Sequence, residues 1–356
     1  MNQSLAVHSR KAQLLTTLCV LFLAAGPIPA QARTAAGAIE KMDKDGDGKL
    51  SRDEWKKKNK FKILDMDGDG YITLRELKIR FGEPLDEAQA SKMPDADSMA
   101  AIRRAGFDDV RHQKDRGLFE TGLHPIWPDN VECRGIDEWY AKDYTPKRPK
   151  ESYHGGIDLP VPFGTPVLSA MSGEVVALYD GKTSPRGMEV VIRHTPDESG
   201  LPLYLYTRYT HFERMPDLHV GQRIKMGDAL GPTGNSGLLG CEVSGKDCRG
   251  KSRRPAIHFD VLYSDSPDYY DTGTLLVPFN AHWMDPNALF RKSLSVDSQA
   301  MKSLPEADKA VPISYMLDSG ELVPPDTRMI WPYPCHKEGD PTGKSDRDEA
   351  PGGFGF

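Results

Sequence analysis

The sequence contains neither an HExxH motif nor a GxSxG motif in its 356 residues. The first absence argues against a metallopeptidase that holds zinc through two histidines on one helix. The second argues against a serine hydrolase built on a nucleophile elbow. The chain is also short of positive charge, with 46 Lys and Arg against 52 Asp and Glu and a formal net charge of −6. An acidic chain is a poor candidate for nucleic-acid binding, so no such partner is expected.

Long apolar runs are scarce, and the one that stands out lies near the N-terminus. It extends from Ala12 to Ala25, follows Arg10 and Lys11, and leads to small residues at 30 and 32. This layout predicts a signal peptide over 1–32 and a periplasmic or secreted protein. A membrane anchor is the alternative, but the run is shorter than the ~20 apolar residues that a span needs. No membrane span is therefore expected after cleavage.

Cysteine is rare, with five residues in the chain, and one of them lies in the predicted signal peptide. An even number then remains, which in an exported protein predicts disulfides. A cysteine metal site is the alternative, but no pair has CxxC spacing. We favour a short Cys241–Cys248 loop, which leaves Cys133–Cys335 as the second pair.

Glycine and proline are abundant, with 33 and 28 residues, which favours turns and short strands. The length predicts two domains with tails. Two segments, 43–54 and 65–76, match the twelve-residue EF-hand loop, in which oxygens at fixed positions surround one calcium ion. The predicted calcium ligands are Asp43, Asp45, Asp47, Lys49, Ser51 and Glu54 in the first loop and Asp65, Asp67, Asp69, Tyr71, Thr73 and Glu76 in the second.

Simple acidic turns are the alternative, but the two matches share glycine and glutamate in register. Leu50 and Ile72, at position 8 of each loop, are expected to pair as a short β-bridge. Calcium could serve stability and docking or could act as a signal, and the sequence leaves both open.

From about residue 150 the pattern changes to short alternating strands. Two places carry residues that suit zinc, the segment His154–Asp158 and the strand around His258. Alternation puts Ile257, Phe259 and the next apolar residues on one face, and His258 on the other. Tyr209 and His211 are expected to share a face of their own strand.

Together these pieces resemble a lysostaphin-type (LytM-like) zinc metallopeptidase domain, a family of peptidoglycan endopeptidases. The resemblance also rests on the Gly-Thr-Pro-Val, Gly-Asp-Ala-Leu-Gly and Thr-Gly-Asn-Ser-Gly segments in the same order. It implies a mostly antiparallel β domain, zinc held by His154, Asp158 and His258, a catalytic His211, and a peptidoglycan substrate. Tyr209, Arg253 and Arg254 are predicted to bind substrate.

Two departures from that family matter. The family usually reads His-x-His on the last strand, and this chain has Ala256 where the first histidine stands. A methyl group cannot carry a proton, and loss of one acid–base partner typically costs ~10²–10⁴-fold. Arg254 or another residue of a long insertion between Gly237 and Pro255 could substitute. This insertion holds several basic residues. They are interpreted either as a positively charged rim that meets acidic groups of the cell wall or as a solvated loop tip.

The expected fold is therefore multidomain α and β, a small α-helical EF-hand pair followed by a mostly antiparallel β LytM-like peptidase domain. The expected function is an exported zinc endopeptidase that cleaves peptidoglycan and binds calcium. The alternative is a catalytically weak or inactive zinc-bound module that binds cell wall or regulates another cell-wall hydrolase. The expected segments are a signal peptide at 1–32, the EF-hand pair at 37–82, a connector at 83–130, the peptidase domain at 131–295, a packed C-terminal extension at 296–335 and a disordered tail at 336–356.

Overall fold

The computed structural model describes residues 34–56, 60–61, 64–65, 71–81, 83, 94–103, 111–136, 144–145, 153–182, 184–243, 245, 247–291 and 296–338. The predicted signal peptide and the predicted tail from residue 339 onward lie outside these residues. Within the described ranges, no helix combines the length and apolar character needed to cross a bilayer.

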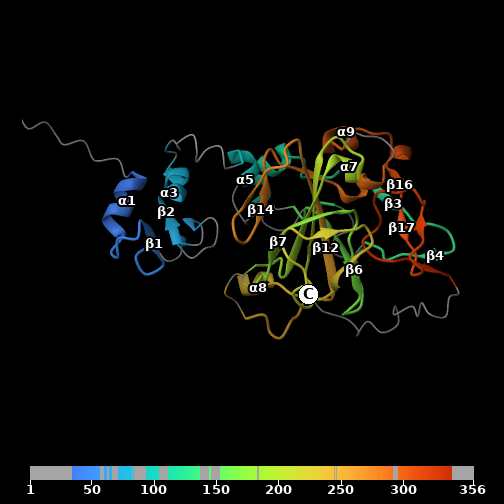
Figure 1. Cartoon of the computed structure of the whole chain (residues 1–356), viewed down its shortest axis with the longest axis horizontal. Coiled ribbons are helices and arrows are strands. Elements are labelled where there is room, and N and C mark those ends of the chain that lie inside the picture. Colours follow the sequence, from blue (N-terminus) through green and yellow to red (C-terminus); the bar gives the residue numbers. More distant parts are fainter. Residues whose placement is uncertain are drawn as a thin grey trace, which may run out of the picture.

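The N-terminal elements form a small helical body with a two-stranded sheet, drawn in blue in Figure 1. Strand β1 pairs antiparallel with β2, and Leu50 lies opposite Ile72, which confirms the predicted bridge. Both side chains are fully buried and share one apolar cluster with Leu77 and Phe61. The elements are α1 (Ala35–Met42), β1 (Lys49–Ser51), β2 (Tyr71–Thr73) and α3 (Leu74–Phe81).

The larger body is built on an antiparallel sheet in the order β10-β7-β8-β9-β12-β15, with β5 also paired to β12. The alternating apolar patterns of the sequence produce these strands. The prediction of a mostly antiparallel β domain after a small helical body is confirmed. The strands are β5 (Ile157–Pro160), β7 (Gly173–Tyr179), β8 (Glu189–His194), β9 (Tyr204–Thr210), β10 (Arg223–Ile224), β12 (Ala256–Ser264) and β15 (His282–Met284).

Both faces of this sheet are covered. One face carries Ile257, Phe259 and Val261 into a core that also contains Trp331 and Tyr333 from the C-terminal segment. The opposite face packs its own side chains against residues from the segment between the two bodies and from β14. The residues of this second core include Met99, Ile102, Leu118, Val191, Tyr206, Leu262, Leu276, Val277 and Trp283. The segment expected as a connector therefore supplies part of the second core.

Short elements connect and flank the main sheet. They are α5 (Ala96–Arg103), α6 (Arg111–Asp115), β3 (His124–Ile126), β4 (Val131–Glu132), β6 (Pro166–Leu168), α7 (Pro196–Ser199), β11 (Ala229–Pro232), α8 (Gly240–Val243), β13 (Tyr269–Asp271), β14 (Leu276–Pro278), η1 (Pro286–Phe290), α9 (Ser298–Lys302), η2 (Glu306–Asp308), β16 (Ala310–Pro312), β17 (Tyr315–Met316), β18 (Leu322–Val323) and β19 (His336–Lys337).

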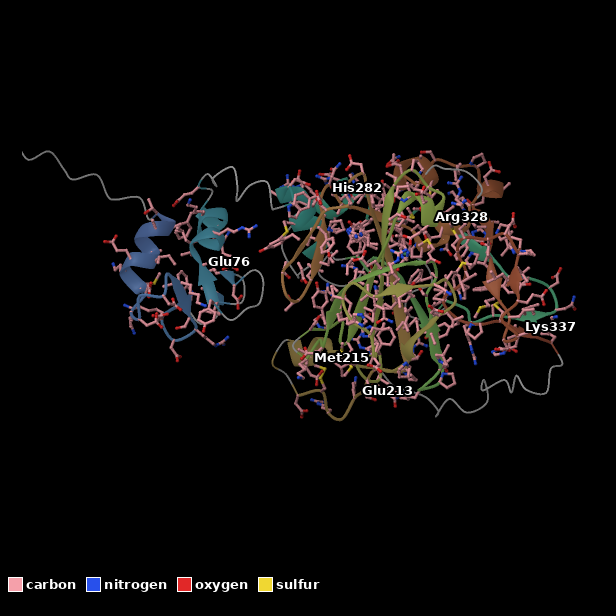
Figure 2. All side chains as sticks on the ribbon, viewed as in Figure 1. Glu76, Glu213, Met215, His282, Arg328 and Lys337 are labelled. Carbon is pink, nitrogen blue, oxygen red and sulfur yellow. A yellow bond between two sulfur atoms is a disulfide. The ribbon has the colours of Figure 1, made fainter. Side chains whose placement is uncertain are left out.

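The disordered tail was predicted to begin at residue 336, but the last strand occupies the first two residues of that segment. His336 and Lys337 form β19, which pairs with Glu132 and Val131 of β4. The preceding residue, Cys335, is disulfide-bonded to Cys133, so the chain is held in register where the tail was expected to begin. Lys337 lies at the end of the molecule opposite Glu76 of the N-terminal body in Figure 2.

Candidate metal centre

Strand β12 brings the predicted zinc ligands together through its register. His258 lies opposite Asp158 of β5 on one side and opposite Thr210 of β9 on the other. Facing residues of antiparallel strands project their side chains to the same face of the sheet. The Asp158 carboxylate therefore meets the His258 ring, and Asp158 Oδ1 lies 2.8 Å from His258 Nδ1.

His154 reaches the same place because two glycines separate it from β5. His154 is 2% exposed, and its Nε2 lies 3.2 Å from Asp158 Oδ1. Gly156 has a φ of 154°, and a Cβ at this position would lie 2.6 Å from the His258 ring. A side chain larger than hydrogen at residue 156 would displace His258, so the glycine is needed for the close approach.

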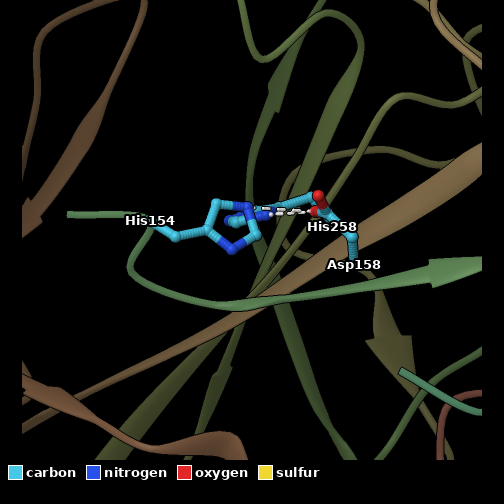
Figure 3. Close-up of side chains that lie close together, drawn as sticks. All are labelled: His154, Asp158 and His258. Carbon is cyan, nitrogen blue, oxygen red and sulfur yellow. Dashed lines mark hydrogen bonds and ion pairs between the residues drawn. The ribbon is translucent and has the colours of Figure 1, made fainter. Parts of the chain in front are cut away.

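The donor atoms of His154, Asp158 and His258 all lie within 4.8 Å of one another, and Figure 3 shows the three side chains converging. Zinc favours imidazole and carboxylate ligands, and its bonds of about 2.0–2.1 Å place neighbouring ligand atoms about 3.4 Å apart in a tetrahedron. The 3.2 Å and 2.8 Å separations at Asp158 Oδ1 are close to this spacing. The residues present therefore fit a zinc ion, and three protein ligands would leave a fourth position open.

A buried ion pair supports His258 from behind. His258 Nε2 lies 3.3 Å from Asp260 Oδ2, and Arg208 donates two hydrogen bonds to the Asp260 carboxylate at 2.5 Å and 3.0 Å. Burial raises the pKa of Asp260, but the charge of Arg208 outweighs it and lowers the pKa to about 2. An ionised Asp260 accepts from Nε2–H, which leaves Nδ1 for a metal.

Charges also fix the protonation of the cluster itself. Burial raises the pKa of Asp158, but His154 and His258 outweigh it and hold the pKa well below the usual range. Burial lowers the pKa of His258, but the hydrogen bonds to Asp158 and Asp260 outweigh it and raise the pKa.

His211 follows the last residue of β9 and lies beside the cluster, with its ring centre 6.3 Å from that of His258. Its Nδ1 is 2.7 Å from the Ser236 carbonyl oxygen, and its main-chain N–H donates to the Arg186 carbonyl. Burial, followed by the positive charge of Arg253, lowers the pKa of His211 to about 3. His211 is therefore neutral near pH 7.

Tyr209 does not face the cluster, so its predicted role in substrate binding is wrong. The side chain is fully buried in the first core against Phe259, and its hydroxyl accepts a hydrogen bond from Ala170 N. Strict alternation would have placed Tyr209 and His211 on one face. His211 has a φ of 72°, so the strand ends before it and its side chain turns to the other side.

The long insertion reaches this site through its last residues. Arg253 Nη1 lies 3.3 Å from His211 Nε2, and Cys241 and Cys248 close the loop as predicted. Arg254 is half-buried, and burial lowers its pKa. Ala256 begins β12 with its main-chain N–H bonded to the Gly234 carbonyl, and it is 7% exposed.

In the N-terminal body, three predicted calcium ligands of the first loop also gather. Asp43, Asp45 and Asp47 each offer a carboxylate oxygen within the same 4.8 Å. Glu54 accepts from Lys44 N and Ser51 N, and Glu76 of the second loop accepts from Thr73 N. Of the remaining predicted ligands, Lys49 and Tyr71 lie on the paired strands, whereas Asp67 and Asp69 lie outside the described residues.

The sequence placed Asp260 on the same face as His258 without giving it a role, and it did not single out Arg208 or Ser236. Asp260 had a usable signal, because it lies two residues after His258 and alternation puts both on one face. Arg208 had none, since its pairing with Asp260 depends on β9 lying next to β12. Ser236 acts through its main-chain carbonyl, which no side-chain pattern reveals.

The larger body is thus a mostly antiparallel β domain in which two buried histidines and a partly buried aspartate converge. Residues 152–268 match the model of Peptidase family M23, and residues 35–57 and 59–81 each match the EF hand model. The chain therefore contains an M23 peptidase domain of the LytM-like type, preceded by an EF-hand pair.

One curated relative is named "Uncharacterized metalloprotease", from Buchnera aphidicola subsp. Baizongia pistaciae. It is 33% identical over 145 residues, which are 41% of this chain and 32% of the relative. The match thus spans about a third of that protein's length.

Solved structures of similar proteins include a mutant catalytic domain of the prophage-encoded M23 protein EnpA from Enterococcus faecalis. It is 24% identical, with 39% of this chain and 85% of that chain covered and a TM-score of 0.27. The catalytic domain of lysostaphin from Staphylococcus simulans is 20% identical, with 38% and 84% covered and a TM-score of 0.27. A zinc-containing peptidase from Vibrio cholerae is 25% identical, with 41% and 40% covered and a TM-score of 0.27.

Proposed function

We propose that this protein is an exported zinc endopeptidase that cleaves peptide bonds in peptidoglycan and carries calcium-binding EF-hands. The observation that carries the proposal is the buried convergence of His154, Asp158 and His258, whose donor atoms lie within 4.8 Å of one another. M23 peptidases, the family that residues 152–268 match, act on peptidoglycan. Two protein imidazoles and one carboxylate are a ligand set of catalytic zinc.

Each residue has a proposed part in the reaction. His154, Asp158 and His258 would hold zinc, which when bound supplies a water of lowered pKa and polarises the substrate carbonyl. His211 is neutral and lies beside the cluster, and we assign its Nε2, which contacts Arg253 in the free protein, the orientation of reacting groups once substrate is bound. Asp260 and Arg208 would keep the His258 ring in place.

Export is supported by the predicted signal peptide and by the two disulfides, because disulfides persist in oxidising compartments. Calcium binding is supported by the carboxylates of the first EF-hand loop. Extracellular EF-hands bind calcium at ~10⁻⁴–10⁻³ M, which suits a site that stays occupied outside the cell.

The test uses the full chain, purified after export, stripped of metal and reloaded with zinc. Dye-labelled sacculi should release muropeptides into the supernatant, and mass spectrometry should identify the cut bond. His258→Ala and Asp158→Asn should each abolish release. His219→Ala, which removes an exposed imidazole far in sequence from the ligands, should release as much as the wild type. Full zinc occupancy with no release would refute the proposal.

A second candidate function rests on Ala256. The methyl group at this position cannot transfer a proton, so the domain could bind cell wall, or regulate another hydrolase, without cutting. Retention of the zinc-loaded protein on insoluble sacculi without muropeptide release would favour this function. Ala256→His would then be expected to create activity that the wild type lacks.

A further inference from the structure

Arg253 occupies a built position at the end of the insertion. Its Nη2 donates to the carbonyl oxygens of Pro185 at 3.1 Å and Leu238 at 3.0 Å, and its own carbonyl accepts from Asn235 Nδ2 at 2.8 Å. Its Nη1 lies 3.3 Å from His211 Nε2. The guanidinium of Arg253 thus contacts three segments: the loop before β8, the start of the insertion and the residue that follows β9.

These contacts determine the tautomer of His211. The Ser236 carbonyl can only accept, so the Nδ1 atom that lies 2.7 Å from it carries the hydrogen. A guanidinium can only donate, so Nε2 presents its lone pair to Arg253. Both ring nitrogens therefore have a defined role, and the ring cannot turn over without losing two hydrogen bonds.

The backbone of His211 is held as firmly as its ring. Its φ of 72° is uncommon for a residue other than glycine, and its N–H is bonded to the Arg186 carbonyl. Such a conformation persists only where its surroundings fix it, and it is typical of functional sites. Arg253 also donates to the carbonyl of Pro185, the residue beside Arg186, so it contacts the segment to which the His211 main chain is bonded.

Ala256 leaves this part of the site without a hydrogen-bonding side chain from β12. Alternation along β12 directs the side chains of 256, 258 and 260 to one face, and the first of these is a methyl group. The methyl group of Ala256 cannot hydrogen-bond to His211 or to a reacting group. Arg253, three residues earlier, supplies a donor with a permanent positive charge instead.

We propose that Arg253 is a positioning residue for His211, which together with the Ser236 carbonyl fixes the Nδ1–H tautomer and the ring orientation relative to the His154–Asp158–His258 cluster. The inference rests on the proposed peptidase function for its kinetic consequence. It does not need that function for the tautomer itself, because the hydrogen bonds exist in the free protein.

The experiment compares three variants of the zinc-loaded full chain. Arg253→Gln should lower kcat ~10–100-fold and change KM less than ~3-fold, since a misplaced group affects the chemical step more than substrate binding. Arg253→Lys keeps a cationic donor and should recover part of that loss. Lys251→Gln removes the same charge from an exposed position of the same loop and should change kcat less than ~2-fold.

The second readout is the ¹⁵N spectrum of histidine-labelled protein, with the His211 signal assigned through His211→Gln. The wild type should show the Nδ1–H tautomer with Nε2 hydrogen-bonded as an acceptor. Arg253→Gln should move the Nε2 signal toward that of a free acceptor or populate the Nε2–H form, because the ring is then held by the Ser236 carbonyl alone. Zinc content and Tm are measured in parallel to identify a variant that fails to fold. If Arg253→Gln does not fold, the kcat and the ¹⁵N signals of Arg253→Lys decide the inference.

Three outcomes would overturn the inference. In the first, Arg253→Gln leaves both ¹⁵N signals of His211 unchanged, whatever it does to kcat. In the second, it raises KM alone, which would make Arg253 a substrate-binding residue. In the third, Lys251→Gln reproduces the loss, which would assign the effect to the charge of the loop. A wild type that cuts no peptidoglycan defeats the proposed function, while the ¹⁵N readout still decides the inference.

Discussion

At the scale of single residues, the Arg208–Asp260 pair shows what a buried ion pair does here. Both side chains are about 1% exposed and share two hydrogen bonds. Removing charges from water costs several kcal/mol per ion, so such a pair is weak evidence for stability. Its use lies in the third contact, which is Asp260 to His258 Nε2. The pair holds a negative charge behind a predicted metal ligand.

We therefore predict that Asp260→Asn weakens zinc binding ~10–100-fold, because an amide is a poorer acceptor for Nε2–H and leaves the ring less basic. Competition between the apoprotein and a chromogenic chelator measures the affinity. Asp308→Asn, which removes an exposed carboxylate in η2, should leave zinc affinity within ~2-fold. Equal affinities for wild type and Asp260→Asn would show that Asp260 does not act on the metal site.

His194 gives a prediction for the pH dependence of stability. It is fully buried, and its ring nitrogens lie 2.7 Å from the Ser172 carbonyl oxygen and 2.8 Å from Thr207 Oγ1. Burial lowers its pKa to about 4, whereas the unfolded chain has a histidine pKa of about 6.5. Between these values the unfolded state binds more protons than the folded state. The contribution of the neutral His194 to the free energy of unfolding is therefore fully present above pH 6.5 and is lost as the pH falls toward 4.

The expected loss from this one group between pH 7 and pH 5 is about 2 kcal/mol. His194→Asn keeps a donor near the Ser172 carbonyl and cannot titrate. Urea unfolding at both pH values should therefore show a smaller pH-dependent loss for His194→Asn than for wild type, whatever the stability of the variant at pH 7. An identical loss in both proteins would mean that His194 does not contribute to it.

Some of these residues could be found in the sequence, and others could not. Alternation identified the face on which His258 lies, and the glycine pair after His154 marked a loop that enters a strand. Alternation failed at Tyr209, because the positive φ of His211 ends the strand, and a dihedral angle leaves no mark on the residue type. The Arg208–Asp260 pair depends on which strands are neighbours, and local patterns do not determine strand order.

At the scale of elements, the first EF-hand loop is shaped around its acidic ligands. Asp43 accepts from the main-chain N–H groups of Gly46 and Gly48, at 2.7 Å and 2.8 Å. Glu54, the twelfth residue of the loop, closes it by accepting from Lys44 and Ser51. The loop backbone is thus held by the carboxylates that a calcium ion needs.

Glu54→Gln should lower the calcium affinity of the first loop at least ~10-fold, because an amide offers one neutral oxygen in place of a bidentate carboxylate. Isothermal titration calorimetry of the full chain should show two sites in the wild type and one in the variant at submillimolar calcium. Asp53→Asn changes the adjacent exposed carboxylate, which is not a predicted ligand, and should keep both sites. A two-site titration for Glu54→Gln would contradict the assignment.

At the scale of the whole molecule, the sheet is closed on both faces by segments far apart in sequence. Met99 and Leu118 cover one face, and Trp331 and Tyr333 cover the other. The sequence predicted the strands well because their patterns are local. It did not predict that the region before the sheet supplies a core, since Met99 and Leu118 are isolated apolar residues whose partners appear only in three dimensions.

The C-terminal segment that covers one face of the sheet, here called the C-terminal cover, is linked to residue 133 by the Cys133–Cys335 disulfide, which joins residues 202 positions apart. The Cys241–Cys248 disulfide joins residues only 7 positions apart. A disulfide stabilises mainly by restricting the unfolded chain, by about 5 kcal/mol for a closed loop of the first length and about 2 kcal/mol for the second. The Cys133→Ser/Cys335→Ser double variant should therefore lose more stability than Cys241→Ser/Cys248→Ser.

Urea unfolding of the two variants, each loaded with zinc and calcium, measures this difference. The insertion variant should instead show its effect at the site, because the bridge lies in the loop that ends at Arg253. Its zinc affinity should match the wild type while its peptidase kcat falls. The reverse ranking of stabilities would mean that the C-terminal segment packs firmly without its disulfide. In that case the buried Trp331 and Tyr333 side chains, rather than the covalent bond, would hold the cover on the sheet.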